Sequence, residues 1–306
     1  MIYDVIVIGS GVAGINSAIY AASEGLSVLV IGKQFGGQIY SSAAVENFFS
    51  HDKVTGRQLI NRGYAQAVKF GTEFANDTIK RIYKFRDNTF HVESETSVYY
   101  GKTVILALGV QYRTLEANGV ENHLGTHIHT GDNVLNHAQR CKNKHVYIVG
   151  GANSAGQAAV YLAKYASKVT MLVRSTLEKS MSAYLIQQIE NAGNIEVLEG
   201  CTLKSVDGSD KLERVIVNHN GNDVSICDCS KLFVFIGAAP MTDWLPESIA
   251  RDDQGYVAVD YRQMTIVKGI FAVGDIVSGS VKRVVTALGS SATAISNVHQ
   301  YLAEVW

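Results

Sequence analysis

The sequence predicts an α/β fold of two Rossmann-like βαβ domains, with the second domain inserted in the first. Three observations lead to this prediction. A strand-like apolar run, a glycine-rich turn and a helical stretch occur near the N-terminus, and the same pattern returns at mid-chain. Near the C-terminus, a third strand-like run ends in Gly274-Asp275 and precedes a helical segment, Val284–Val305. We therefore expect one split domain, residues 1–112 and 241–306, around an inserted domain, residues 113–240.

The first glycine turn follows residues 4–8, whose β-branched, apolar side chains are typical of a strand buried on both faces of a parallel sheet. The turn reads G-S-G-V-A-G. In this pattern Gly9 permits the tight turn, Gly11 lets a pyrophosphate approach the backbone, and Gly14 lets helix and strand pack closely. The N-terminus of the helix then stabilises the phosphate charge. The pattern favours a dinucleotide site over a turn without a ligand.

The second strand of this first unit, residues 27–31, lacks the acid that usually binds the ribose hydroxyls of NAD. Gly32 and Lys33 stand at its end instead. NAD is therefore disfavoured at this site, and another adenine dinucleotide is expected.

The second glycine turn, residues 150–155, reads G-G-A-N-S-A and follows the apolar strand 145–149. Ala152 replaces the glycine nearest the phosphate, so this turn indicates either a nucleotide site or a retained fold without a ligand. Arg174 and Lys179 come after the next strand. They fit the 2′-phosphate of NADP(H), and the alternative is two solvated surface charges.

Composition restricts the function classes. The 306 residues carry 27 basic and 28 acidic side chains, a formal net charge of -1, which gives no sign of a nucleic-acid partner. No apolar run is long enough for a membrane span, and residues 5–8 lead directly into a glycine turn rather than a signal-peptide cleavage site. Only four cysteines occur, which predicts a reducing, cytoplasmic location.

Taken together, seven motifs resemble the low-molecular-weight thioredoxin reductases, flavoproteins of the pyridine nucleotide–disulfide oxidoreductase type. The resemblance runs from about residue 2 to residue 303 and keeps the order and spacing of the motifs. The motifs are Gly9 to Gly14, Gly36-Gly37-Gln38, Glu46-Asn47, Ala107-Leu108-Gly109, Gly150 to Ala155, Gly274-Asp275 and Lys282-Arg283-Val284.

The resemblance implies a homodimer with FAD in the split domain and NADPH in the inserted domain, which rotates in such enzymes. The positions that match FAD-binding residues are Gly9, Gly11, Val12, Ala13, Gly14, Gly37, Gln38, Asn47, Ala107, Gly109, Gly274, Asp275, Lys282, Arg283 and Val284. The positions that match the second nucleotide site are Gly151, Ala152, Asn153, Ser154, Ala155, Arg174 and Lys179.

The chain departs from the family in its cysteines. The family carries a C-x-x-C dithiol just before the strand of the second motif, whereas residues 125–136 contain no cysteine here and Cys141 stands alone. Without that dithiol, reduced flavin cannot pass two electrons to thioredoxin through an internal disulfide. The nucleotide motif also departs, because residues 173–179 keep two of the family's three cationic positions.

Residues 153–160, 172–175 and 180–182 resemble a bacterial subgroup that includes cyanobacterial proteins, some of them linked to ferredoxin or holding a second flavin. We therefore expect a flavin oxidoreductase that passes electrons from NAD(P)H or ferredoxin to an unknown acceptor. Two alternatives stay open. One is a diflavin protein with a second FAD in the inserted domain, and the other is a flavin-binding redox sensor without turnover.

His127 and His129 occupy the window that faces the flavin in the family, so they are the candidate catalytic residues, as proton relays. The alternative is a pair of histidines on a solvent-facing loop. A metal site is not predicted, because the His-x-His pair lacks a visible third ligand.

Two further features have no assigned role. Cys227 and Cys229 form the closest cysteine pair, either structural or a relocated redox pair together with Cys201. Trp306 either stacks on a flavin from a partner subunit or anchors an interface.

Overall fold

The computed structural model describes the whole chain except residues 43–44, 46–47, 53, 132–133 and 227–228. The described residues form two compact units, the first from residues 1–111 and 239–306 and the second from residues 112–238. Each unit contains parallel strands with a βαβ glycine turn, so the predicted pair of Rossmann-like folds is confirmed.

The first unit is built on a seven-stranded sheet in the order β3-β2-β1-β6-β5-β4, with β17 paired to the second half of β6. Strands β1, β2, β3, β6 and β17 run parallel, whereas β4 and β5 are antiparallel. The strands are β1 (Ile2–Ile8), β2 (Val28–Ile31), β3 (Glu73–Ala75), β4 (Ile79–Lys84), β5 (Phe90–Ser94), β6 (Val98–Leu106) and β17 (Ile270–Ala272).

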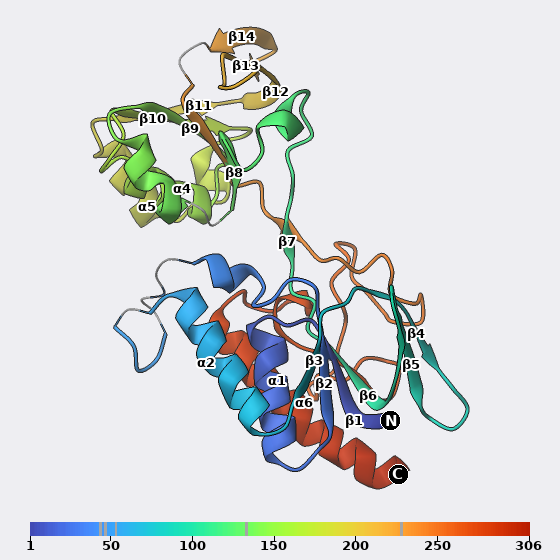
Figure 1. The fold of residues 1–306 in the computed structure, drawn as a ribbon. Coiled ribbons are helices and arrows are strands. Elements are labelled where there is room, and N and C mark those ends of the chain that lie inside the picture. Colours follow the sequence, from blue (N-terminus) through green and yellow to red (C-terminus); the bar gives the residue numbers. More distant parts are fainter. Residues whose placement is uncertain (43–44, 46–47, 53, 132–133, 227–228) are drawn as a thin grey trace. The chain divides into compact units, whose positions relative to one another are not determined.

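Three helices cover one face of this sheet, α1 (Val12–Ser23), α2 (Gly56–Lys69) and α6 (Val284–Val305) (Figure 1). Small side chains let α1 and α6 approach closely, and the Ser291 hydroxyl of α6 donates a hydrogen bond of 2.9 Å to the carbonyl of Ala13. Helix α2 begins with a capping box in which Thr55 and Gln58 bind each other's backbone amides. The short 3₁₀ turns of this unit are η1 (Gln38–Ser41) and η5 (Gly274–Ile276).

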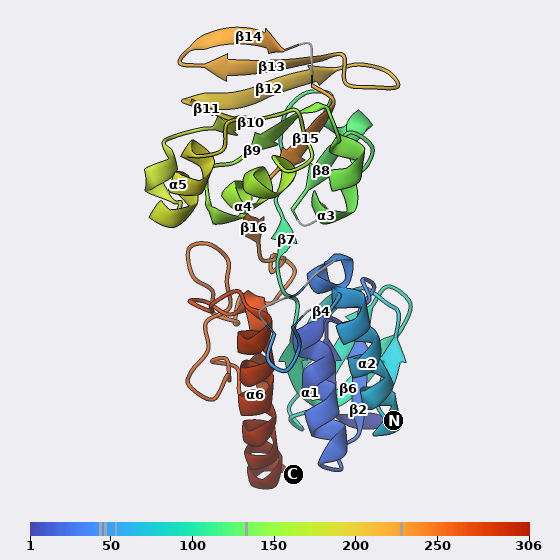
Figure 2. The ribbon, with the colours of Figure 1, turned by 90° about the vertical axis from the view of Figure 1, so that its left-hand side faces the viewer.

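The second unit has a five-stranded, fully parallel sheet in the order β11-β10-β9-β15-β8. Its strands are β8 (Ile128–Thr130), β9 (His145–Val149), β10 (Lys168–Val173), β11 (Ile195–Glu199) and β15 (Lys231–Val234). One face packs against helices and the other against a three-stranded antiparallel sheet (Figure 2).

The covering elements of the second unit are α3 (Val134–His137), α4 (Asn153–Leu162) and α5 (Ala183–Glu190) on the first face, and β12 (Cys201–Asp207), β13 (Arg214–His219) and β14 (Asn222–Ile226) on the second. Its 3₁₀ turns are η2 (Val120–His123), η3 (Ala138–Cys141) and η4 (Leu177–Lys179). Where the chain passes between the units, β7 (Gln111–Tyr112) pairs with β16 (Ala238–Ala239).

No helix of the described chain is long and apolar enough to span a membrane.

Candidate functional site

The first glycine turn is fixed by close backbone packing. A Cβ atom on Gly9 would lie 2.3 Å from the carbonyl oxygen of Ala107, and one on Gly14 would lie 1.8 Å from that of Gly9. Both distances are far below van der Waals contact, so the fold itself demands glycine at these positions. The turn therefore brings the end of β1 against the end of β6 and sets the start of α1 beside both.

Gly11 is different, because its missing side chain leaves space. The nearest protein atom to a Cβ on Gly11 would be the Cα of Gly37, at 3.8 Å. Gly11 is the N-cap of α1, which has no side-chain cap and no acidic residue in its first turn. The first amides of α1 therefore have no side-chain cap at Gly11, and such an uncapped helix N-terminus stabilises a phosphate.

The segments predicted to surround this turn lie next to it. Gly36 donates its amide to the carbonyl of Ser10 at 2.9 Å, and Gly36 and Gly11 form a parallel bridge. A Cβ on Gly274 would lie 2.9 Å from the Cβ of Ala13, so the Gly-Asp turn and the start of α1 are in contact. The side-chain amide of Gln38 donates a hydrogen bond to the backbone carbonyl of Val110, the residue after Gly109.

Asp275 and Lys282 give this site its charges. The carboxyl of Asp275 has no recorded hydrogen bond within the described residues, and burial raises its pKa against an opposing effect of Lys282. The Lys282 ammonium donates to the backbone carbonyl of Asp275 at 2.6 Å and lies 4.2 Å from the ring centre of Tyr256. The free acceptor, the uncapped helix and the empty space at Gly11 are the features that FAD requires, so these residues fit it.

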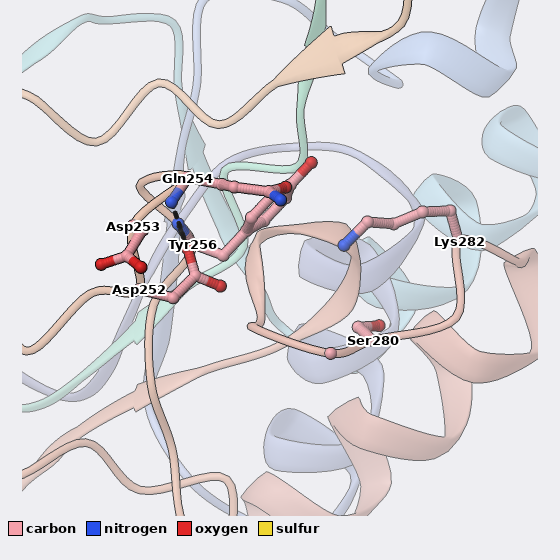
Figure 3. A pocket seen from close by; sticks show the side chains of 7 residues that line it. Asp252, Asp253, Gln254, Tyr256, Ser280 and Lys282 are labelled. Atoms are coloured by element: carbon pink, nitrogen blue, oxygen red, sulfur yellow. Dashed lines mark hydrogen bonds between the residues drawn. The ribbon is translucent and has the colours of Figure 1, made fainter.

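A pocket of 470 Å³ opens beside Lys282 (Figure 3). Its lining comes from the turn at 252–256 and from the segment before α6. The carboxylate of Asp252 is already engaged, because it accepts from the Ser278 hydroxyl at 2.6 Å and from two backbone amides. The pocket thus has a rigid acidic wall facing the Lys282 amine.

Most of the remaining predicted FAD positions lie at the starts of α1 and α6. Arg283 is the N-cap of α6, and like α1 this helix has no side-chain cap and no acidic residue in its first turn. Val12, Ala13 and Val284 lie in the first turns of the two helices. Asn47 lies outside the described residues.

The second glycine turn has the same construction in the second unit. Gly150 has φ +142°, and a Cβ there would lie 2.4 Å from the carbonyl oxygen of Phe235. Ala152 is the N-cap of α4 and, like Gly11, makes no side-chain cap. Asn153 and Ser154 are exposed in the first turn of the helix, and Ala155 is buried.

Arg174 and Lys179 are both exposed just beyond β10, and no ion pair is recorded for either within the described part of the chain. The segment between them is held in place. The backbone amide of Leu177 donates to the Glu199 carboxylate at 2.9 Å, and the Ser180 hydroxyl donates to the carbonyl of Gly151 at 3.1 Å. Glu199 did not stand out in the sequence, since a single acid carries no pattern. Ser180 was noted only within residues 180–182, which resemble the bacterial subgroup, and not as a residue of the site.

The candidate catalytic histidines lie in and beside β8. His129 is 2% exposed, so the solvent-facing loop alternative is wrong for this residue. Its ring stacks on that of His137 at 3.7 Å between centroids, and its Nε2 is 3.3 Å from the Nζ of Lys231. Burial, followed by His137 and Lys231, lowers the pKa of His129 to about 3. Any proton transfer through His129 at neutral pH therefore uses the neutral ring.

His127 is half-buried, and its Nδ1 has no hydrogen-bond partner among the described residues. Burial, with a contribution from Lys231, lowers its pKa as well. Lys231 and His137 were not singled out from the sequence. Lys231, at the start of β15, comes next to the pair through the parallel pairing of β15 with β8. His137, at the end of α3, is placed by its stacking on His129.

Three of the cysteines are described, Cys141, Cys201 and Cys229, and each is buried in the second unit. Cys141 and Cys201 are free thiols. Burial raises the pKa of the Cys141 and Cys201 thiols, which disfavours the reactive thiolate. Cys227 lies outside the described residues. No group of three or more His, Cys, Asp or Glu side chains in the described chain is arranged to hold a metal ion.

Trp306 ends the chain after α6, with its ring 5.5 Å from the Nζ of Lys102 on β6. Lys102 lies near the start of the parallel part of β6, whereas the glycine turn lies beyond its end. Trp306 therefore lies near the end of the sheet opposite to the first glycine turn.

Comparison with known proteins agrees with this construction. Residues 3–291 match the family model described as pyridine nucleotide-disulphide oxidoreductase. Thioredoxin reductase from Treponema pallidum is 31% identical over 308 residues, covering 98% of this chain and 97% of its own. NADH dehydrogenase from Bacillus subtilis is 28% identical and matches over 58% of its own length. The crystal structure of Lactococcus lactis thioredoxin reductase superposes with a TM-score of 0.87 at 25% identity, covering 99% of both chains.

Proposed function

The chain belongs to the pyridine nucleotide-disulphide oxidoreductase family, and from that premise we propose a reductase that delivers electrons from its flavin directly to an external acceptor, without an internal dithiol. It is a flavin-dependent oxidoreductase, and thioredoxin reductases use FAD and NADPH. When bound, FAD supplies the chemistry that accepts two electrons from one partner and passes them to another.

The observation that carries the proposal is the state of the cysteines. No two of the four have C-x-x-C spacing. Cys141 and Cys201 are free, buried thiols on η3 and β12, and Cys229 is buried next to β15. Buried thiols with raised pKa values exchange poorly with disulfides. We propose that the acceptor is a small disulfide, a quinone or a protein that takes two electrons and two protons.

We propose that FAD binds at the first glycine turn. The amides of α1 would hold the pyrophosphate beside Gly11, and Asp275 would accept hydrogen bonds from hydroxyl groups of the ribityl chain. The support is the uncapped helix, the space at Gly11 and the unengaged carboxyl of Asp275. Gly37, Gln38 and Lys282 complete the surroundings in this proposal.

We propose NADPH as the electron donor at the second glycine turn. Two exposed cations without recorded ion pairs, Arg174 and Lys179, stand beyond β10, where a 2′-phosphate is bound in this fold. A hydride from NADPH carries two electrons and one proton, so the acceptor's second proton comes from solvent or from a side chain such as His127.

The test is anaerobic mixing of the flavin-loaded protein with NADPH, NADH or a reduced ferredoxin. Bleaching of the flavin by NADPH at a low concentration, and by NADH only at a higher one, supports the proposal. If only reduced ferredoxin bleaches the flavin, ferredoxin and not NADPH is the electron donor. Two flavins per chain would favour the diflavin alternative, and reversible photoreduction without turnover with any donor would favour the sensor.

A homodimer and a cytoplasmic location belong to the same proposal. Both come from the resemblance and from the small number of cysteines. Sedimentation of the flavin-loaded protein measures the first, and a monomer at micromolar concentration would contradict it.

A further inference from the structure

We infer that Glu199 is a positioning residue that holds segment 174–182 in the conformation that recognises a 2′-phosphate, and so sets the preference for NADPH over NADH. The inference rests on the proposed function, because it concerns the same nucleotide site. It names a residue outside the glycine turn and outside the pair of cations.

Glu199 lies at the end of β11, beside the end of β10. It is the last residue of β11 and pairs with Val173, the last residue of β10. Its carboxylate accepts the backbone amide of Leu177 at 2.9 Å. Leu177 is itself 5% exposed and packs in the core of the second unit. One carboxylate thus fixes the middle of the segment that follows β10.

The far end of the same segment is hydrogen-bonded to the second glycine turn and the start of α4. The Ser180 hydroxyl donates to the carbonyl of Gly151 at 3.1 Å, and the amide of Ser182 donates to the Asn153 side chain at 2.8 Å. Both acceptors belong to the second glycine turn and the start of α4. The segment is therefore tied to the turn at one end and to β11 in the middle.

Two cations, Arg174 and Lys179, belong to the segment that these hydrogen bonds hold. Arg174 and Lys179 are exposed, one on either side of Leu177. A long cationic side chain binds a phosphate well only if its backbone is already placed, because ordering the segment would otherwise oppose binding. Releasing Leu177 frees the backbone of both cations, whereas the glycine turn keeps its own close contacts. Recognition of the 2′-phosphate should suffer, and recognition of the remaining nucleotide should not.

The test uses the flavin-loaded full chain and two small probes, 2′,5′-ADP and 5′-AMP, with binding measured by calorimetry. We expect Glu199→Ala to weaken the binding of 2′,5′-ADP by about tenfold and the binding of 5′-AMP by less than about twofold. Glu199→Gln keeps a carbonyl oxygen for the Leu177 amide, so its affinity for both probes should stay near wild type. In turnover, Glu199→Ala should raise the KM for NADPH and leave kcat and the KM for NADH nearly unchanged.

Two further variants separate positioning from charge and from folding. Glu178→Ala removes an acid from the same segment whose side chain has no recorded bond in the described chain, so it should leave 2′,5′-ADP binding unchanged or tighten it. Ser180→Ala loosens the segment at its other tie, and it should weaken 2′,5′-ADP in the same direction as Glu199→Ala even if the latter folds poorly.

The inference is overturned if Glu199→Ala binds 2′,5′-ADP as wild type does, if it weakens both probes equally, or if Glu199→Gln is as damaged as Glu199→Ala. A selective loss of NADH with Glu199→Gln would instead make this carboxylate a ligand of the ribose hydroxyls, and would also overturn it. If the wild-type protein binds neither probe, the proposed donor is wrong, and that outcome is distinct from all the others.

Discussion

Burial shifts the pKa values of two side chains at the candidate sites. His129 is enclosed by His137 and Lys231, and its pKa falls to about 3, so the ring is neutral at neutral pH. Burial raises the pKa of Asp275, although Lys282 opposes the effect. In both cases burial favours the uncharged form, which is the usual consequence of removing an ionisable group from water.

His129 should make the protein sensitive to mild acid. In the unfolded chain its pKa returns to 6.5, so between pH 6.5 and about 3 the unfolded state binds a proton that the folded state does not. The free energy of unfolding should therefore decrease as the pH falls through this window. His129→Gln keeps an acceptor for Lys231 and should flatten the decrease in urea melts. His219→Gln, on β13, is the control and should keep the wild-type slope. An unchanged slope in His129→Gln would contradict the account.

Asp275 should matter for flavin retention and little for folding. Removing an acceptor for charge-assisted hydrogen bonds should weaken FAD by about tenfold in Asp275→Ala, with a smaller loss in Asp275→Asn. The measurement is the flavin absorbance retained per chain after dialysis. Asp253→Ala, an exposed acid of the neighbouring pocket, is the matched control. Equal retention in Asp275→Ala and Asp253→Ala would remove the assigned role.

Single residues were predictable where a pattern requires them and not where tertiary contacts bring them in. Gly9 and Gly14 followed from the motif, and the backbone distances explain why. Lys231, His137 and Glu199 belong to no motif. Lys231 and Glu199 reach the sites through parallel strand pairing between segments that lie apart in the sequence, and His137 through its stacking on His129. Sequence order does not reveal such contacts.

At the level of elements, the first glycine turn separates folding from binding. Gly14→Ala would place a Cβ 1.8 Å from the carbonyl oxygen of Gly9, so it should lower the free energy of unfolding by about 3 kcal/mol or more. Gly11→Ala meets nothing closer than 3.8 Å and should fold nearly as well as wild type. Its affinity for FAD should nevertheless fall by about tenfold or more, since the added methyl group would occupy the space for the pyrophosphate.

Thermal melting by circular dichroism and flavin absorbance measure the two effects separately. A Gly11→Ala protein that retains FAD like wild type would show that the ligand does not approach the backbone at this turn. A stable Gly14→Ala protein would show that α1 and β1 can move apart.

Element boundaries were predictable where hydrophobic periodicity is strong. The strands 145–149 and 168–173 and the helix 284–305 coincide with β9, β10 and α6. The helix after the first turn begins at Val12, three residues before the apolar run at Ile15 that suggests it, because the glycine turn itself enters the helix. β8 has only three residues and pairs with β15, some hundred residues later, so no local pattern indicated it.

At the level of the whole molecule, each unit carries a glycine turn on a βαβ fold, and the sequence contains no C-x-x-C pair, so we propose that no internal dithiol carries electrons. A variant in which Cys141, Cys201, Cys227 and Cys229 are all alanine should therefore keep wild-type reduction of the flavin and of the acceptor. Alanine suits the buried positions of Cys141 and Cys201 because it introduces no polar group there. Retained flavin reduction with lost transfer to the acceptor would show that a thiol carries electrons after all.

The most direct test of the account is the number of electrons that the protein takes up. An anaerobic titration with NADPH, followed by flavin absorbance, counts them. Without a dithiol, the flavin should bleach fully with one equivalent of NADPH per FAD, because two electrons fill the only redox centre. A protein that consumes two equivalents before the flavin is fully reduced holds a second two-electron centre, and that result would contradict the account.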